Sequence, residues 1–121
     1  MMTTSSAVSN AGGLGLIGAG SMPPEVLKEH IQKVKQHTEK PFGVNLPLFY
    51  SRIDEMVDLI IAERVPIVFT SAGNPDTFTQ RFKQQGITVV HVVANVKFAL
   101  KSQQAGVDAI VGRSRITRVP L

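Results

Sequence analysis

Short apolar runs alternate with amphipathic stretches along this chain, and the alternation limits its possible folds more than any other feature. Five runs rich in Val, Ile, Leu and Phe read as strands: residues 14–18, 42–46, 67–70, 87–93 and 108–111. Most of them are apolar at nearly every position, as is typical of parallel strands that are covered on both faces. Since parallel strands need right-handed crossovers, the pattern predicts an α/β fold.

Helical periodicity fills the intervals between these runs. Apolar residues recur at helical spacing in two of them: Val26, Leu27, Ile31 and Val34, then Ile53, Met56, Val57, Ile60 and Ile61. Shorter helices are predicted near 78–82 and 96–100, and a helical stub near 5–11. Ser51 with Asp54 predicts a capping box. Gly86 and Gly106 follow polar helix ends and are predicted to terminate them.

The stretch GAGSMP (18–23) follows the first strand and matches five positions of the dinucleotide-binding turn G-x-G-x-x-G. The sixth position is Pro23, whose ring opposes the close packing that a glycine permits there. The second strand ends at Asn45, where a dinucleotide site needs an acidic residue. A Rossmann site is therefore disfavoured, and the pattern leaves an open doubly wound sheet or a segment of a (β/α)8 barrel.

Composition excludes several classes of function. The 121 residues contain no cysteine, which excludes disulfides and thiolate metal sites, and no apolar stretch approaches the roughly 20 residues of a membrane span. The start lacks the basic region of a signal peptide, so we expect a cytoplasmic protein. The net charge is +4, but without Arg113, Arg115 and Arg118 it is only +1. The basicity belongs to the tail, which argues against a nucleic-acid-binding face.

Ligands of both candidate architectures bind at the carboxyl ends of the parallel strands. The residues there are small, polar and nearly uncharged: 18–21, Asn45, 70–74, 93–95 and 112–113. Such a rim suits a flat polar ring and offers no carboxylate pair and no metal-ligand cluster, so we assign no catalytic residue and no metal site. Asn45 reads equally well as a ligand contact or as a turn residue before Pro47, whereas Ser71 and Gly73 fit a turn better.

The three histidines do not suggest a catalytic centre. His91 lies within the fourth strand and is predicted to be a packed or hydrogen-bonded core residue. His30 and His37 lie on or beside a polar helix and are predicted to be solvated. No pairing of a nucleophile with a base can be assembled from these residues.

Five segments occur in the order and spacing of a known family: AVSNAGGLGLIGAG (7–20), PFGVNLPL (41–48), IVFTSAGNP (67–75), VVHVVANVKFA (89–99) and AGVDAIV (105–111). Over residues 7–111 the chain resembles the nitronate monooxygenases, formerly called 2-nitropropane dioxygenases. Their relatives are the flavin-containing enoyl-acyl-carrier-protein reductases. The first two segments together are fairly specific, whereas the last two recur in many barrels.

The resemblance implies a (β/α)8 barrel with FMN at the mouth formed by the carboxyl ends of the strands. Asn45 matches the family's flavin-contacting asparagine, and Ser71 and Ala94 would lie near the same cofactor. The family chemistry is flavin-dependent oxidation of alkyl nitronates, which form from nitroalkanes, with dioxygen as the oxidant. The flavin supplies the redox step and the protein positions it.

The chain also departs from the family at both ends. It lacks the family's first strand with its Gln-Gly-Gly-Met-like loop, and the Glu-Ala-Gly-Gly-His loop whose histidine serves as the base. Residues 112–121 (GRSRITRVPL) match nothing in the family. We therefore expect one partial barrel domain over 1–121, truncated at both ends, with about five of eight strands and no phosphate cradle. Such a fragment would bind FMN poorly and would not oxidise nitronates by itself.

Two other functions remain open at this point. Five strands leave two open edges and an uncovered apolar face, which predicts self-association and a non-catalytic, oligomerising half-barrel. A nucleic-acid binder using the tail is disfavoured, because three arginines without interleaved aromatic residues make a poor binding surface. The residues that would separate nitronate oxidation from enoyl reduction lie outside the matched segments.

Overall fold

Six strands form one sheet, in the order in which they occur along the chain. The computed structural model describes residues 15–20, 22–49, 51–74, 78–93, 96–112 and 115–118. The parallel strands are β1 (Gly15–Gly18), β2 (Phe42–Pro47), β3 (Ile67–Ser71), β4 (Thr88–Val92) and β5 (Ala109–Gly112). The five predicted strands are thus confirmed. A sixth strand, β6 (Arg115–Arg118), runs antiparallel to β5 and was not predicted.

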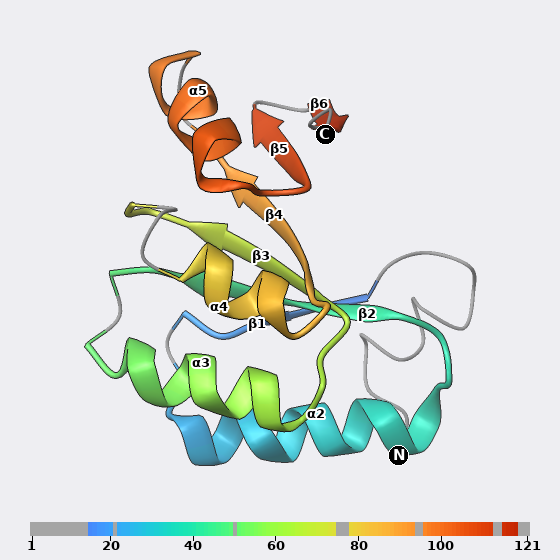
Figure 1. Cartoon of the computed structure of the whole chain (residues 1–121). Helices are drawn as coiled ribbons and strands as arrows, with labels where there is room; N and C mark the ends of the chain where they lie inside the picture. The colour runs from blue at the N-terminus through green and yellow to red at the C-terminus, as the bar shows by residue number, and fades with distance from the viewer. Residues whose placement is uncertain are drawn as a thin grey trace.

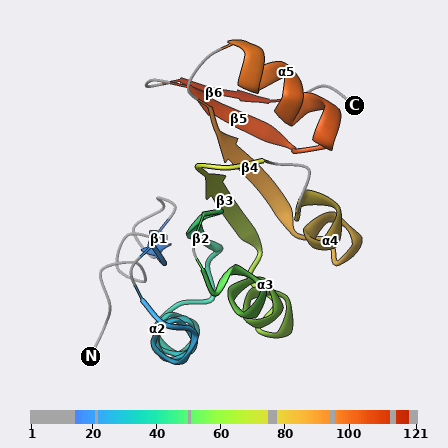
Figure 2. The same cartoon turned by 90° about the vertical axis from the view of Figure 1, so that its left-hand side faces the viewer.

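Helices connect the parallel strands in the predicted places (Figure 1). They are α2 (Pro24–His37), α3 (Ile53–Ala62), α4 (Thr79–Gln84) and α5 (Val96–Ala105). Figure 2 shows that the sheet curves and that α2, α3 and α4 follow its convex side. A doubly wound sheet would carry helices on both faces, so this arrangement is that of an incomplete α/β barrel. The helical stub predicted near 5–11 lies outside the described residues.

The hydrophobic core lies between the helices and the convex face of the sheet. In α2 the buried stripe is Leu27, Ile31 and Val34, and in α3 it is Met56, Val57 and Ile60. These stripes pack with strand residues that are themselves fully buried: Val44, Leu46, Val68 and Val89. Because successive side chains of a strand point to opposite faces, the residues adjacent to these four in sequence lie on the other face of the sheet.

The start of α3 differs from the predicted capping box. The N-cap is Arg52 and no side chain caps the helix, so Ser51 lies one residue before the N-cap and does not form the predicted box with Asp54. The Arg52 guanidinium instead binds Glu55 at 2.6 Å and Glu25 of α2 at 3.1 Å. Hydrogen bonding to Arg52 lowers the pKa of Glu55. This ion cluster ties the first turn of α2 to the first turn of α3.

The turns that lead from helices back to strands use backbone with positive φ. Gly86 and Gly106, which were predicted to terminate helices, have φ of 75° and 92°. The corresponding position after α3 is occupied by Arg64, with φ of 53°. A side chain in the left-handed region is strained, so the α3–β3 turn adopts the same backbone geometry at a higher conformational cost.

The opposite side of the sheet, called here the concave face, is not covered by any described helix (Figure 2). Strand alternation assigns the following residues to it: Leu16, Gly18, Gly43, Asn45, Pro47, Ile67, Phe69, Ser71, Val90 and Val92. A methyl group placed on Gly43 would lie 2.8 Å from Leu16 Cδ2 and 3.4 Å from Phe69 Cδ1, which confirms their shared side. Leu16 remains 45% exposed and Val92 39% exposed on this face.

Candidate functional site

Asn45 carries the most unusual polar group of the concave face. Its neighbours Val44 and Leu46 are fully buried on the helix side, so the Asn45 side chain lies on the other side of β2. Among the described residues, its Oδ1 is the buried side-chain nitrogen or oxygen atom that lacks a hydrogen-bond partner. Leaving a buried acceptor unpaired costs about 1–3 kcal/mol. The local structure therefore leaves Asn45 Oδ1 in need of a donor.

The neighbours of Asn45 across the sheet leave room on one side and present an aromatic ring on the other. Gly18 pairs with Asn45 from β1, and Phe69 pairs with it from β3. A methyl group on Gly18 would meet no atom within 4 Å, so the space beside Asn45 is open there. The backbone is fixed, because the Ala19 N–H donates to the Asn45 carbonyl oxygen at 2.9 Å. The backbone of Gly18, the side-chain amide of Asn45 and the ring of Phe69 therefore lie side by side on adjacent strands.

Ser71 lies one strand away, at the end of β3 and on the same face as Asn45. It pairs with Pro47, and its carbonyl oxygen accepts the Leu48 N–H at 2.7 Å. The chain then turns through Ala72 and Gly73, with φ of 49° and 141°. A methyl group on Gly73 would lie 2.8 Å from Leu48 Cβ, so only glycine allows this close approach. The turn after β3 is thereby locked to the end of β2.

The structure thus brings two of the three predicted site residues, Asn45 and Ser71, to one face at the carboxyl ends of neighbouring strands. The third, Ala94, lies outside the described residues. Gly18 and Phe69 also belong to this region and were not predicted as site residues. Aligning the neighbouring strands with β2 would have found them, because Gly18 and Phe69 are the register partners of Asn45 and share its face.

His91 lies on the other side of the sheet, as the prediction of a core residue requires. It is 2% exposed, and its Nδ1 is 2.7 Å from Thr70 Oγ1 on the neighbouring strand. Its neighbours on that face are the buried Val68 and Val89. Burial lowers the pKa of His91, because the charged imidazolium is poorly solvated there. The ring is therefore separated by the sheet from Asn45.

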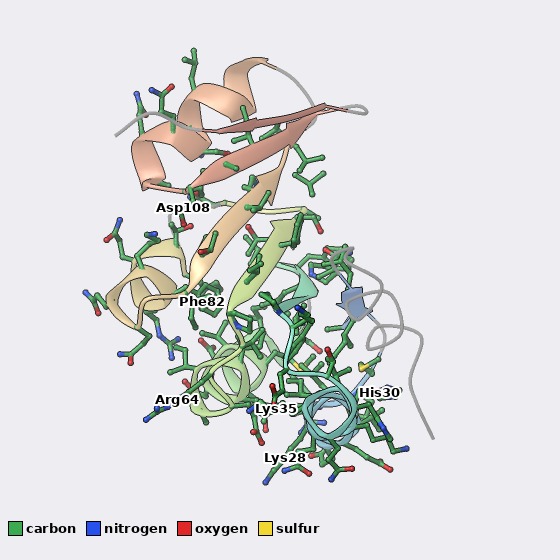
Figure 3. All side chains as sticks on the ribbon, turned by 90° about the vertical axis from the view of Figure 1, so that its right-hand side faces the viewer. Lys28, His30, Lys35, Arg64, Phe82 and Asp108 are labelled. Atoms are coloured by element: carbon green, nitrogen blue, oxygen red, sulfur yellow. The ribbon has the colours of Figure 1, made fainter. Side chains whose placement is uncertain are left out.

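The two other histidines, His30 and His37, lie on α2 rather than at this site. His30 is exposed on α2, as predicted (Figure 3). His37 at the end of α2 is half-buried, so the prediction of a solvated side chain holds only in part there. Within the described ranges, no three His, Cys, Asp or Glu side chains gather as they would around a metal ion. In the same ranges, no helix is both long and apolar enough to cross a membrane.

Comparison with known proteins finds one matching family model and several similar, longer proteins. A family model described as nitronate monooxygenase matches residues 3–58. The (3aS,4S,5R,7aS)-5-hydroxy-7a-methyl-1-oxo-octahydro-1H-indene-4-carboxyl-CoA dehydrogenase of Mycobacterium tuberculosis is 34% identical over 106 residues, which make up 88% of this chain and 30% of that protein. A probable nitronate monooxygenase of Staphylococcus aureus is 29% identical over 142 residues, covering 88% of this chain and 40% of that protein.

Solved structures agree with these sequence matches. FabK from Thermotoga maritima superposes with a TM-score of 0.86 at 42% identity, over 89% of this chain and 35% of that chain. A nitroalkane oxidase from Streptomyces ansochromogenes superposes with a TM-score of 0.79 at 19% identity, over 90% of this chain and 41% of that chain, and shows the shared fold. The chain therefore spans between 30% and 41% of the length of these proteins.

Proposed function

Because the chain belongs to the nitronate monooxygenase family, whose enzymes carry a flavin, we propose that the concave face around Asn45 forms part of an FMN site in an enzyme that oxidises nitronates. The observation that carries the proposal is the buried, unpaired Oδ1 of Asn45. The isoalloxazine ring of a flavin has an imide N–H, which is the kind of donor that this acceptor lacks. The residues present therefore fit the ring of the cofactor.

Each residue of the site has a physical role in this proposal. Asn45 accepts a hydrogen bond from the ring, and Gly18 leaves the space that a side chain would fill. Phe69 contributes apolar surface that keeps water from the base of the site, and Ser71 offers a hydroxyl at its rim. Ala94 is a further proposed contact. When bound, FMN would supply the redox chemistry of nitronate oxidation by dioxygen.

The same residues suggest that this chain does not turn over substrate by itself. The described residues of the concave face are apolar groups, glycines, an amide and a hydroxyl, and none of them titrates near neutral pH. A general base for proton removal must reach the substrate within hydrogen-bonding distance. His91 cannot do so from this face, because it lies on the helix side of the sheet. We propose that the concave face supplies contacts to the flavin ring, and neither the base nor the phosphate-binding loop that turnover requires.

Flavin titrations test this proposal directly. The chain is added to micromolar FMN or riboflavin, and binding is followed by the fluorescence anisotropy of the flavin. Since only ring contacts are proposed, the two flavins should bind weakly and with equal affinity. Asn45→Leu should weaken binding about fivefold to tenfold, the value of one neutral hydrogen bond. Gln84→Leu replaces an exposed amide on α4 and should leave the affinity unchanged.

Two results would contradict the proposal. The first is unchanged anisotropy up to millimolar protein, or equal affinity of the parent chain and Asn45→Leu, which would remove the role of Asn45. The second is FMN binding that is tenfold or more tighter than riboflavin binding, which would require a phosphate site within this chain.

A non-catalytic half-barrel that pairs with a second copy is the second candidate. It is favoured by the partial exposure of Leu16 and Val92 on the concave face, since homodimer interfaces are enriched in apolar surface. Light scattering during size-exclusion chromatography separates the two functions. A discrete dimer that excludes flavin supports the half-barrel module, and a monomer that binds flavin supports the cofactor site.

A further inference from the structure

The edge of the sheet beyond β5 is where a parallel barrel adds its next strand. In this chain β6 lies along that edge (Figure 2). Each residue of β5 has a partner in β6, from Ala109 with Arg118 to Gly112 with Arg115. Edge strands with unpaired N–H and C=O groups invite pairing with another chain. The backbone that would offer this template is therefore already paired within the molecule.

The direction of β6 is incompatible with continuation of the barrel. Only residues 113–114 separate β5 from β6, which is the length of a tight hairpin connection. A further parallel strand would need a crossover of a dozen or more residues. The hairpin therefore places an antiparallel strand in the position that a parallel strand would occupy in a complete barrel.

The sequence of β6 suits the end of a sheet. Its two central residues, Ile116 and Thr117, are β-branched and favour extended backbone. Arg115 and Arg118 stand at its two ends, and charged residues on an edge strand hinder the addition of further strands. The arginine-rich tail, which has no counterpart in the matched family segments, thus has the composition of an edge strand.

We propose that β6 is a terminating strand, which occupies the β5 edge and prevents a second copy of this chain from adding a strand there. This role is independent of flavin binding, because β6 and Asn45 belong to strands at different places in the sheet order. It predicts that residues 115–118, by pairing with β5, prevent strands of other copies from extending the sheet at β5.

Size-exclusion chromatography with light scattering tests the proposal on three proteins: the full chain, a chain ending at residue 112, and I116P/T117P. Consecutive N–H groups of a strand point to opposite sides, so one of the two prolines removes a donor that faces β5. At equal concentration, both altered chains should show a larger fraction of dimer and higher oligomers. R115K/R118K retains strand and charge and should match the full chain.

Hydrogen exchange of the full chain provides a test that needs no variant. If β6 pairs with β5 in solution, the amides within 115–118 that face β5 should exchange at least tenfold more slowly than an unstructured peptide. Exchange at the unstructured rate would overturn the proposal. An unchanged mass distribution in both the shortened chain and I116P/T117P would overturn it as well.

Discussion

At the scale of single residues, Asn45 and His91 show how strand alternation gives two polar side chains opposite environments. Asn45 lies on the concave face with a buried acceptor that has no partner, whereas His91 lies among core residues and is hydrogen-bonded to Thr70. His91 could be predicted from sequence, because a lone histidine within an apolar strand is usually a satisfied core residue. The buried, unpaired state of Asn45 could not, because it depends on the side chains that β1 and β3 place beside it.

The buried pair of Thr70 and His91 predicts a dependence of stability on pH. Burial lowers the pKa of His91 in the folded state, so the unfolded chain binds more protons near pH 6. The contribution of neutral, buried His91 to the free energy of unfolding is therefore fully present above the unfolded pKa of about 6.5. It is lost as the pH falls below that value, by at most about 1.4 kcal/mol per pH unit. T70V/H91L replaces both partners with apolar groups and should lack this slope. Urea unfolding between pH 5 and 8 measures it, and parallel profiles for the two proteins would contradict the assignment.

At the scale of elements, the five parallel strands and the helices between them could be predicted from the sequence, whereas the residues at which they begin and end could not. Continuous apolar runs and helical stripes indicate elements reliably, since burial of their side chains stabilises them. The N-cap of α3 is Arg52, which is paired with Glu25 on another helix, and no local sequence pattern contains that pairing. The strand β6 was missed because four residues with two arginines carry almost no apolar signal, and its stability depends on pairing with β5.

The α3–β3 turn gives a prediction at this scale. Arg64 has a positive φ where the equivalent turns have Gly86 and Gly106. Arg64→Gly relieves the strain and should raise the free energy of unfolding by about 0.5–1 kcal/mol. Ala62→Gly, two residues earlier and within α3, should lower it by about the same amount. Chemical denaturation of the three proteins measures both changes, and a destabilised Arg64→Gly would show that the Arg64 side chain stabilises the turn by other contacts.

At the scale of the whole molecule, the chain is a curved segment of a barrel whose convex face is covered by helices and whose concave face is covered by no described helix. Sequence predicted the barrel segment through its resemblance to the nitronate monooxygenases, and the superposition on FabK confirms the fold. The predicted open edge beyond β5 was wrong, because β6 is paired with it. The pairing of the β5 edge with β6 arises from the three-dimensional arrangement and is not encoded in any single segment.

The most direct test of the flavin site is an amide ¹H–¹⁵N correlation spectrum of the chain recorded during titration with FMN. The account predicts that the largest chemical-shift changes fall on Gly18, Ser71 and the backbone and side-chain amides of Asn45. Amides at the opposite end of the sheet, such as Gly86, should stay in place. Shift changes that cluster on the helix surfaces, or their absence at millimolar FMN, would contradict the account.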